Sequence, residues 1–315
     1  MTGPFTAALW LLLYQPDPAA LIPLYQKALA EREKELGPSH PKLARLSSDF
    51  GLFYRKQGNL DQARPLLRRA LDIDERHYGA TNRITAEDME NLASVVTPEE
   101  AIALRLRAAQ CDDAGVAARN LASVGAWEEA RGNRQRALAF YQQALSKEKA
   151  ASGESHPRYA VRMNDLALLL LPADAEPILR QALAIQESAL GAEHPEVAVT
   201  LNNLANVLLA NNHPEEAERS ARRALAVLEK ALGASHPRVA TAASNLADIL
   251  QARGDLAGAR LLYQRALRID EIAYGQNHPE VAVDLENLAA LLDRMGRKAE
   301  AARHRARAAN IKAAR

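Results

Sequence analysis

The chain has 315 residues, with 40 basic and 39 acidic side chains and a formal net charge of +1 at pH 7. This balance gives no overall attraction to nucleic acid, to an anionic membrane or to an acidic substrate. The only cysteine is Cys111, which excludes an intrachain disulfide and favours a reducing compartment. Arginine far outnumbers lysine and alanine is abundant, a composition typical of a GC-rich bacterial genome.

The N-terminal apolar run from Phe5 to Tyr14 is too short to span a bilayer. No basic residue precedes it, as one would in a signal peptide. We therefore expect a cytoplasmic protein without a membrane segment. Residues 5–36 are interpreted as a first helical hairpin whose leading helix is trimmed.

The second hairpin opens at Gly37-Pro-Ser-His-Pro41. Proline is well tolerated at the first helical position, where its missing N–H would be unpaired in any case. The first helix carries Asp49-Phe-Gly-Leu, Gly58-Asn59 forms a turn, and a second helix follows to Gly79. Glycine at that point predicts a left-handed C-terminal cap.

The third and fourth hairpins are irregular, with a junction near 97–127. Gly79-Ala-Thr-Asn-Arg83 lacks the His-Pro pair, the turn before Pro98 is shortened by four residues, and the tail of the second helix is missing. Two registers remain open for 111–132. Either Asn120-Leu-Ala carries the repeat motif, which we prefer, or Ser123-Val-Gly takes its place.

The remaining hairpins open at Gly153-Glu-Ser-His-Pro157 and at glycines 191, 233 and 275, which are 42 residues apart. A fixed period of this size predicts a repeat array. Apolar residues at 3.6-residue spacing, such as Val197, Leu201, Leu204 and Leu208, predict amphipathic helices. A single hairpin cannot bury both of its apolar stripes, so the hairpins must stack. The polar helix from Arg297 suits the open end of a stack.

The recurring sequence Gly-x-x-His-Pro-x-Val-Ala-x-x-Leu-Asn-Asn-Leu-Ala, with small residues such as Ala205, Ala217 and Ala224, resembles the tetratricopeptide (TPR) repeats of kinesin light chain. The motif is nearly intact at 194–205, 236–247 and 278–289. The resemblance implies an all-α, right-handed superhelical solenoid of about eight antiparallel helix pairs, a single domain over 1–315. It also implies that the first helices line a concave groove.

In related repeats, a polar residue just before the Leu-Ala pair lines the groove and binds the main chain of an extended peptide. The matching positions here are Asp49, Asn91, Asn120, Asp165, Asn203, Asn245 and Asn287. An amide has donors and an acceptor, so a row of amides can bind a peptide backbone without reading its side chains. Specificity would come from neighbouring positions: Arg45, Ser48, Arg55, Lys56, Glu90, Arg119, Asn164, Asn202, Asn206, Asp248, Gln251, Glu286 and Asp293. The alternative is that the amides join adjacent hairpins.

The histidines at 40, 156, 194, 236 and 278 recur once per hairpin. Stacked helices lie about 8–10 Å apart, whereas zinc needs ligands at about 2.0–2.1 Å from one ion. We therefore expect helix capping and no metal. No phosphate-binding glycine loop, nucleophile elbow or paired cysteine motif is present. The sequence predicts no cofactor and no enzymatic activity.

The predicted function is a scaffold that binds a protein or peptide partner in its groove. The alternatives are self-association through an end hairpin, where Leu9, Trp10 and Leu12 have few neighbours, and a sensor or docking segment of a larger regulatory protein. The basic segment from Arg294 to Arg315 could attract nucleic acid or lipid, but it has no interleaved aromatic residues. We interpret it as a solvated capping helix.

Overall fold

A computed structural model of the chain describes residues 18–314. Its contacts separate two compact units, which meet between Ala151 and Ser152. We describe each unit by itself, and the continuous domain over 1–315 stays a prediction. The leading helix expected at 5–14 and its three apolar residues lie outside the described part of the chain.

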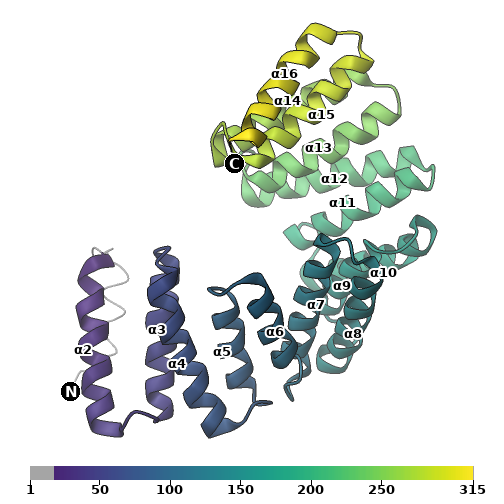
Figure 1. Cartoon of the computed structure of the whole chain (residues 1–315). Helices are drawn as coiled ribbons and strands as arrows, with labels where there is room; N and C mark the ends of the chain where they lie inside the picture. Colours follow the sequence, from purple (N-terminus) through teal and green to yellow (C-terminus); the bar gives the residue numbers. More distant parts are fainter. Residues whose placement is uncertain (1–17, 315) are drawn as a thin grey trace. The chain divides into compact units, whose positions relative to one another are not determined.

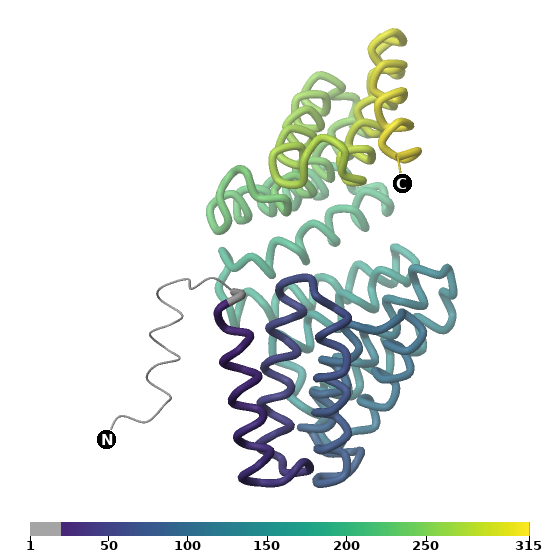
Figure 2. Tube along the Cα trace, turned by 60° about the vertical axis from the view of Figure 1, so that its left-hand side comes forward, coloured from purple at the N-terminus to yellow at the C-terminus, as the bar shows by residue number. Residues whose placement is uncertain are grey.

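The all-helical class is confirmed, because the described residues form fifteen helices and no strand. Unit 1 holds α2 (Pro18–Leu36), α3 (Pro41–Lys56), α4 (Leu60–Tyr78), α5 (Arg83–Ala93), α6 (Pro98–Ala108), α7 (Ala114–Ala130) and α8 (Arg134–Ser152). Unit 2 holds α9 (Pro157–Ala167), α10 (Pro172–Leu190), α11 (Pro195–Ala210), α12 (Pro214–Leu232), α13 (Pro237–Ala252), α14 (Leu256–Tyr274), α15 (Pro279–Arg294) and α16 (Lys298–Ala313). Figure 1 and Figure 2 show these helices as successive hairpins.

Each regular hairpin packs its two helices through small side chains. In α12, Ala217, Ala221 and Ala224 are fully buried, and they belong to one apolar core that runs through unit 2. The second helix of a hairpin also packs on the first helix of the next, as α12 does on α13 and α14 does on α15. Every inner hairpin is therefore held on two sides, as a stacked array requires.

The helix ends follow the sequence signals. Gly191, Gly233 and Gly275 end second helices with φ of 84° to 87°, a region that glycine enters without steric penalty. At the other end, the five His-Pro histidines precede first helices. Each His Nδ1 accepts the N–H two residues on at 3.1–3.3 Å. The predicted capping role of the histidines is confirmed.

The irregular hairpins are shorter than the regular ones. The first helix α5 has 11 residues where α11 has 16, and the second helix α6 has 11 where α12 has 19. The missing tail of the second helix is confirmed. The deletion before Pro98 shortens the C-terminal end of the first helix and does not shorten the loop between the two helices. Asn82 replaces the lost histidine, because its Oδ1 accepts the N–H of Ile84 at 2.9 Å.

The register of α7 corrects our preference for Asn120. A Cβ on Gly125 would lie 2.8 Å from the Tyr141 ring, just as one on Gly51 would lie 2.7 Å from Leu67. Gly125 therefore takes the place of Gly51, and of the alanine in Asn-Leu-Ala. The helix ends six residues later, at Arg131, as α3 does at Gln57. Ser123-Val-Gly125 is the motif of this hairpin.

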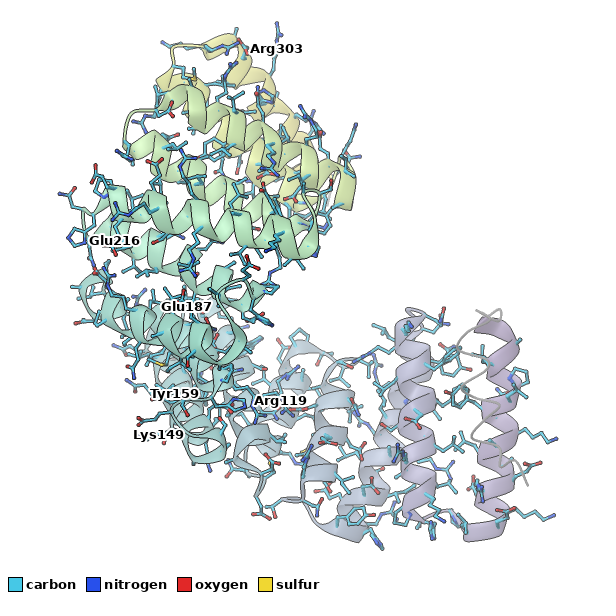
Figure 3. All side chains as sticks on the ribbon, turned by 180° about the vertical axis from the view of Figure 1, so that it is seen from behind. Arg119, Lys149, Tyr159, Glu187, Glu216 and Arg303 are labelled. Atoms are coloured by element: carbon cyan, nitrogen blue, oxygen red, sulfur yellow. The ribbon has the colours of Figure 1, made fainter. Side chains whose placement is uncertain are left out.

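A row of ion pairs joins consecutive second helices at one repeated position. In unit 2, Arg223 pairs with Glu187 at 2.6 Å, Arg265 with Glu229 at 2.5 Å, and Arg307 with Glu271 at 2.5 Å. Glu187 is labelled in Figure 3. Unit 1 repeats the arrangement with Arg69–Glu33 and Arg107–Glu75. These pairs are partly solvated, so each contributes little to stability. Because they recur at the same position, they fix the register between consecutive second helices.

Candidate functional site

The first helices form one layer in each unit, which we call the inner layer: α3, α5 and α7 in unit 1, and α9, α11, α13 and α15 in unit 2. Three pairs of successive first helices approach each other directly: α3 and α5, α5 and α7, and α11 and α13. Among the described residues, no two successive second helices pack so closely. These close approaches are expected if the first helices face the concave side of each unit. The predicted site residues all belong to this layer.

Two of the predicted asparagines bind the preceding hairpin. Asn91 Nδ2 donates to Ser48 Oγ at 3.2 Å, and Asn203 Nδ2 donates to Asn164 Oδ1 at 3.2 Å. Asn164 in turn donates to Thr200 Oγ1 at 2.7 Å, within the same pair of hairpins. These amides join first helices through side chains.

Asn120 is fully buried and lies one helical turn before the motif position. Its Nδ2 donates to Glu90 Oε1 at 2.7 Å and to the carbonyl of Val116 at 3.0 Å. Ser123 stands at the motif position instead, and its hydroxyl donates to the carbonyl of Arg119 at 3.0 Å. The sequence is compatible with both registers, and the close approach of Gly125 to Tyr141 and the end of α7 at Arg131 distinguish them.

Asn245 and Asn287 differ from the other asparagines. Both are half-buried on α13 and α15, and no residue within 18–314 accepts from or donates to their side chains. Asn206 on α11 is exposed and has no such partner either. Asn202 is 7% exposed, and its Oδ1 has no hydrogen-bond partner in the described structure. Unit 2 therefore offers a group of unused amides on its inner layer.

The charged candidates are mostly paired within the protein. Arg55 donates to Ser94 Oγ at 3.0 Å, and Arg119 pairs with Glu90 at 3.3 Å. Asp165 pairs with Arg162 at 2.6 Å.

Two of the predicted aspartates have shifted pKa values. Burial raises the pKa of Asp49, and the positive charge of exposed Arg45 on the same helix opposes this shift. Burial likewise raises the pKa of Asp248, whose carboxylate accepts the Tyr263 hydroxyl. Burial and the Asp248 carboxylate also raise the pKa of Tyr263.

Two acidic candidates on α15, Glu286 and Asp293, are paired with the basic C-terminal helix α16. Lys312 pairs with Glu286 at 2.7 Å, and Arg305 pairs with Asp293. Arg307 is held by Glu271. The basic side chains of α16 and these acidic side chains thus neutralise each other.

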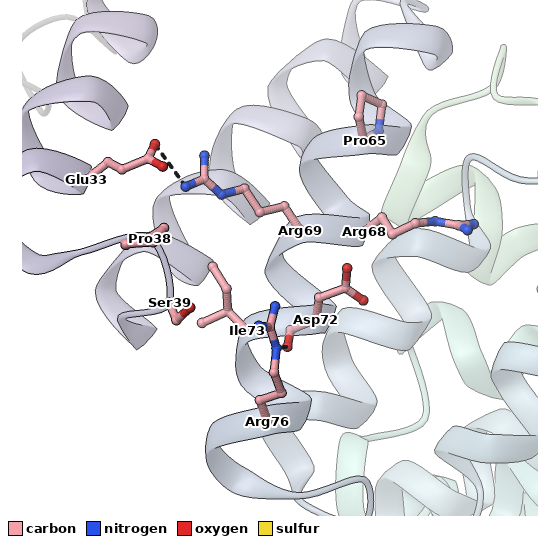
Figure 4. A pocket seen from close by; sticks show the side chains of 9 residues that line it. All are labelled: Glu33, Pro38, Ser39, Pro65, Arg68, Arg69, Asp72, Ile73 and Arg76. Atoms are coloured by element: carbon pink, nitrogen blue, oxygen red, sulfur yellow. Dashed lines mark hydrogen bonds and ion pairs between the residues drawn. The ribbon is translucent and has the colours of Figure 1, made fainter.

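A cavity of about 650 Å³ lies on unit 1, between α4 and the α2–α3 turn (Figure 4). Three arginines line it, but Arg69 pairs with Glu33 at 2.9 Å and Arg68 pairs with Glu100. Arg76 donates to the carbonyl of Asp72 at 2.8 Å. The cavity is an open depression with mixed charge, away from the inner layer.

Within residues 18–314, no three His, Cys, Asp or Glu side chains are grouped as metal ligands would be. None of the helices there combines the length and apolar character needed to cross a bilayer. Cys111 is buried, and its thiol donates to the carbonyl of Asp113 at 3.2 Å.

Comparison with solved structures shows where this fold occurs. The chain is 23% identical to BtubC (BKLC) from P. vanneervenii, with 79% of this chain and 91% of that chain covered and a TM-score of 0.54. A Rap protein complexed with Competence and Sporulation Factor is 16% identical, with coverages of 86% and 77% and a TM-score of 0.62. A kinesin light chain of Podosopora anserina with TPR-like repeats is 21% identical, with coverages of 75% and 98% and a TM-score of 0.38. No curated protein matches the sequence.

Family models identify the repeat itself. Tetratricopeptide repeat models match residues 11–76, 46–97, 121–158, 171–230, 214–272 and 238–314. The matches cover most of the chain, with residues 98–120 and 159–170 outside them. This chain belongs to the tetratricopeptide repeat family, as the recurring His-Pro and Asn-Leu-Ala motifs predicted.

Proposed function

We propose that this protein is a non-catalytic scaffold that binds an extended segment of a partner protein along the inner layer of unit 2. The observation that carries the proposal is the group of unused amides at Asn206, Asn245 and Asn287. Amides left without partners within the protein remain able to bind a peptide backbone, which offers one N–H and one C=O per residue.

The contacts of the other polar residues show which of them are not available to a partner. Asn91 and Asn203 use their donors on a neighbouring hairpin, and buried Asn120 is not accessible to a partner. Asp165 on α9 and Asp248 on α13 would flank the bound segment and help to select it. A repeat protein of this fold has been solved with Competence and Sporulation Factor bound, so the fold is compatible with holding a partner. A cytoplasmic location stays a prediction.

The test distinguishes asparagines that bind a partner from asparagines that join neighbouring hairpins. Peptide ligands are first selected from a random 12-residue display library with the full chain, and their affinities are measured by fluorescence anisotropy. Asn245→Ala with Asn287→Ala should weaken binding at least tenfold and leave the urea midpoint unchanged. Asn203→Ala should instead lower stability by about 1 kcal/mol, because it removes one hydrogen bond. The control is Asn277→Ala, an exposed loop asparagine.

Equal binding by the Asn245→Ala, Asn287→Ala variant and the unchanged protein would refute the proposal. Self-association is the competing function, in which a second copy covers the same surface. Light scattering of the purified chain distinguishes the two, because a monomer over the micromolar range contradicts self-association.

A further inference from the structure

Two interfaces between successive hairpins each bury a pair of aspartates. Asp74 on α4 faces Asp88 on α5 in unit 1, and these side chains are 5% and 6% exposed. Asp270 on α14 faces Asp284 on α15 in unit 2, at 7% and 6%. Each pair joins a second helix to the first helix of the next hairpin, and the two residues are 14 positions apart in both cases. The two units thus contain the same arrangement.

The oxygen atoms of these pairs are not compatible with two ionised carboxylates. Oδ1 of Asp74 and Oδ2 of Asp88 have no donor in the described structure, and neither have Oδ1 of Asp270 and Oδ2 of Asp284. Each pair lies where its two helices pack on each other, and the two carboxyl groups act on each other's pKa. A carboxylate only accepts, so a hydrogen bond between two carboxyl groups requires one proton. One shared proton per pair satisfies the buried acceptors.

The surrounding charges favour this protonated form. Burial raises the pKa of Asp284 to about 7, and the negative charges of Asp270 and Glu280 act in the same direction. The Ser244 hydroxyl on α13 lies 3.5 Å from Asp284, and His278 opposes the shift of Asp270. On α13, Arg238 lines the same small cavity as Asp270 but pairs with Glu196 at 3.7 Å. Three cations of α16 are paired elsewhere: Arg305 with Asp293, Arg307 with Glu271 and Lys312 with Glu286.

The environment of the first pair is similar. Burial raises the pKa of Asp88, and the Asp74 carboxyl adds to this shift. Ser48 on α3 lowers the pKa of Asp88 and Glu87 on α5 raises it, while His77 on α4 lowers the pKa of Asp74. The neighbouring cations Arg107 on α6 and Arg119 on α7 are paired with Glu75 and Glu90.

Other interfaces show that packing does not require carboxyl groups at this position. In the α10–α11 interface, Thr200 Oγ1 donates to Gln186 Oε1 at 2.5 Å. In the α12–α13 interface, the equivalent residues are Leu228 and Ala242, both buried in the apolar core. A neutral hydrogen-bonded pair or an apolar pair therefore closes the same junction. The aspartate pairs add sensitivity to protons, which the other two pairs lack.

We propose that the Asp74–Asp88 and Asp270–Asp284 pairs are proton-dependent latches: the shared proton holds each interface closed, and its loss loosens α5 from α4 and α15 from α14. In an opened interface each aspartate regains its ordinary pKa of about 3.9. The closed interface then holds one more proton than the open one. Its opening constant rises up to tenfold per pH unit, and the rise ends near pH 7 in unit 2, at the pKa of Asp284.

Hydrogen exchange of the full chain between pH 5 and 9, corrected for the intrinsic exchange rate, tests the latches directly. The opening constant of α14 and α15 should rise about tenfold per unit from pH 5 to 7 and then level off. The amides of α12 and α13, joined through Leu228 and Ala242, provide the internal control and should show a constant value. A pH-independent α14–α15 interface, or equal changes in both regions, would overturn the proposal.

Substitutions identify the responsible groups. In Asp284→Asn, the amide donates to an ionised Asp270 without a shared proton, so the rise with pH should disappear. The matched control is Asp174→Asn on α10, which removes the same charge at an exposed position and should keep the wild-type dependence. If Asp284→Asn does not fold, the double variant Asp270→Leu with Asp284→Ala replaces it. This variant places the apolar pair of the α12–α13 interface, Leu228 and Ala242, at the α14–α15 interface, and its rise with pH should also disappear. Wild-type pH dependence in either folded variant contradicts the latch.

Discussion

Removal of the histidine caps of α11 and α13 should destabilise unit 2 by a predictable amount. His194 Nδ1 accepts the N–H of Glu196 at 3.2 Å, and His236 Nδ1 accepts that of Arg238 at 3.1 Å. Loss of a side-chain N-cap costs about 0.5–2 kcal/mol, typically about 1. Both histidines are half-buried, so water replaces them incompletely. The caps share no hydrogen-bond partner, so the costs should add to about 2 kcal/mol.

Urea unfolding followed by far-UV circular dichroism measures this loss in His194→Ala with His236→Ala. The matched control is His194→Asn with His236→Asn, because Asn82 performs the same capping at the start of α5. The asparagine variant should stay within about 0.5 kcal/mol of the unchanged protein. If the asparagine variant loses as much stability as the alanine variant, the histidines act through packing and the capping argument fails.

Three further predictions concern the hairpin contacts. Gly125→Ala should destabilise the protein by about 1–2 kcal/mol in urea, because the added methyl meets the Tyr141 ring and overpacking exceeds the gain in helix propensity; an unchanged midpoint would contradict the register of α7. Arg223→Ala and Arg265→Ala should each cost less than about 1 kcal/mol at low salt and nothing in 1 M NaCl; a cost that persists in salt would show a packing role. Burial raises the pKa of Cys111, so its thiol should react with a disulfide reagent at pH 8 only as the hairpin opens, and reaction at the rate of a free thiol would refute this.

The fold could be predicted because its signals are local and repeat. Proline after histidine starts each regular first helix, and glycine ends the second helix before it. The apolar spacing fixes which face of each helix is buried. The lengths of α5 and α6 also follow from missing residues, since a helix that lacks five residues loses about one and a half turns.

The polar contacts of the site could not be predicted in the same way. Asn203 and Asn245 occupy the same position in identical motifs, yet Asn203 binds Asn164 while Asn245 has no partner in the described structure. The preceding hairpin offers an asparagine in both cases, Asn164 and Asn202. Asn164 is held by Thr200, however, whereas the equivalent of Thr200 in the next hairpin is Ala242. A single repeat does not show what its neighbour offers. The register of α7 could not be predicted for the same reason. Ser123 takes the motif position in place of Asn120 because Gly125 packs closely on Tyr141, which belongs to the next helix.

The junction that carries Asp270 and Asp284 has one consequence for how such arrays can be rearranged. Gln186 has a threonine opposite it, Leu228 has an alanine, and Asp270 has a second carboxyl group. A hairpin moved to another place would set a buried carboxyl group against an alkyl side chain, with no donor to satisfy it. Neighbours are thus matched by chemistry as well as by shape. A chain with the same hairpins in another order would therefore be less stable at these junctions. The buried polar residues thus help to determine the order of the hairpins within a unit.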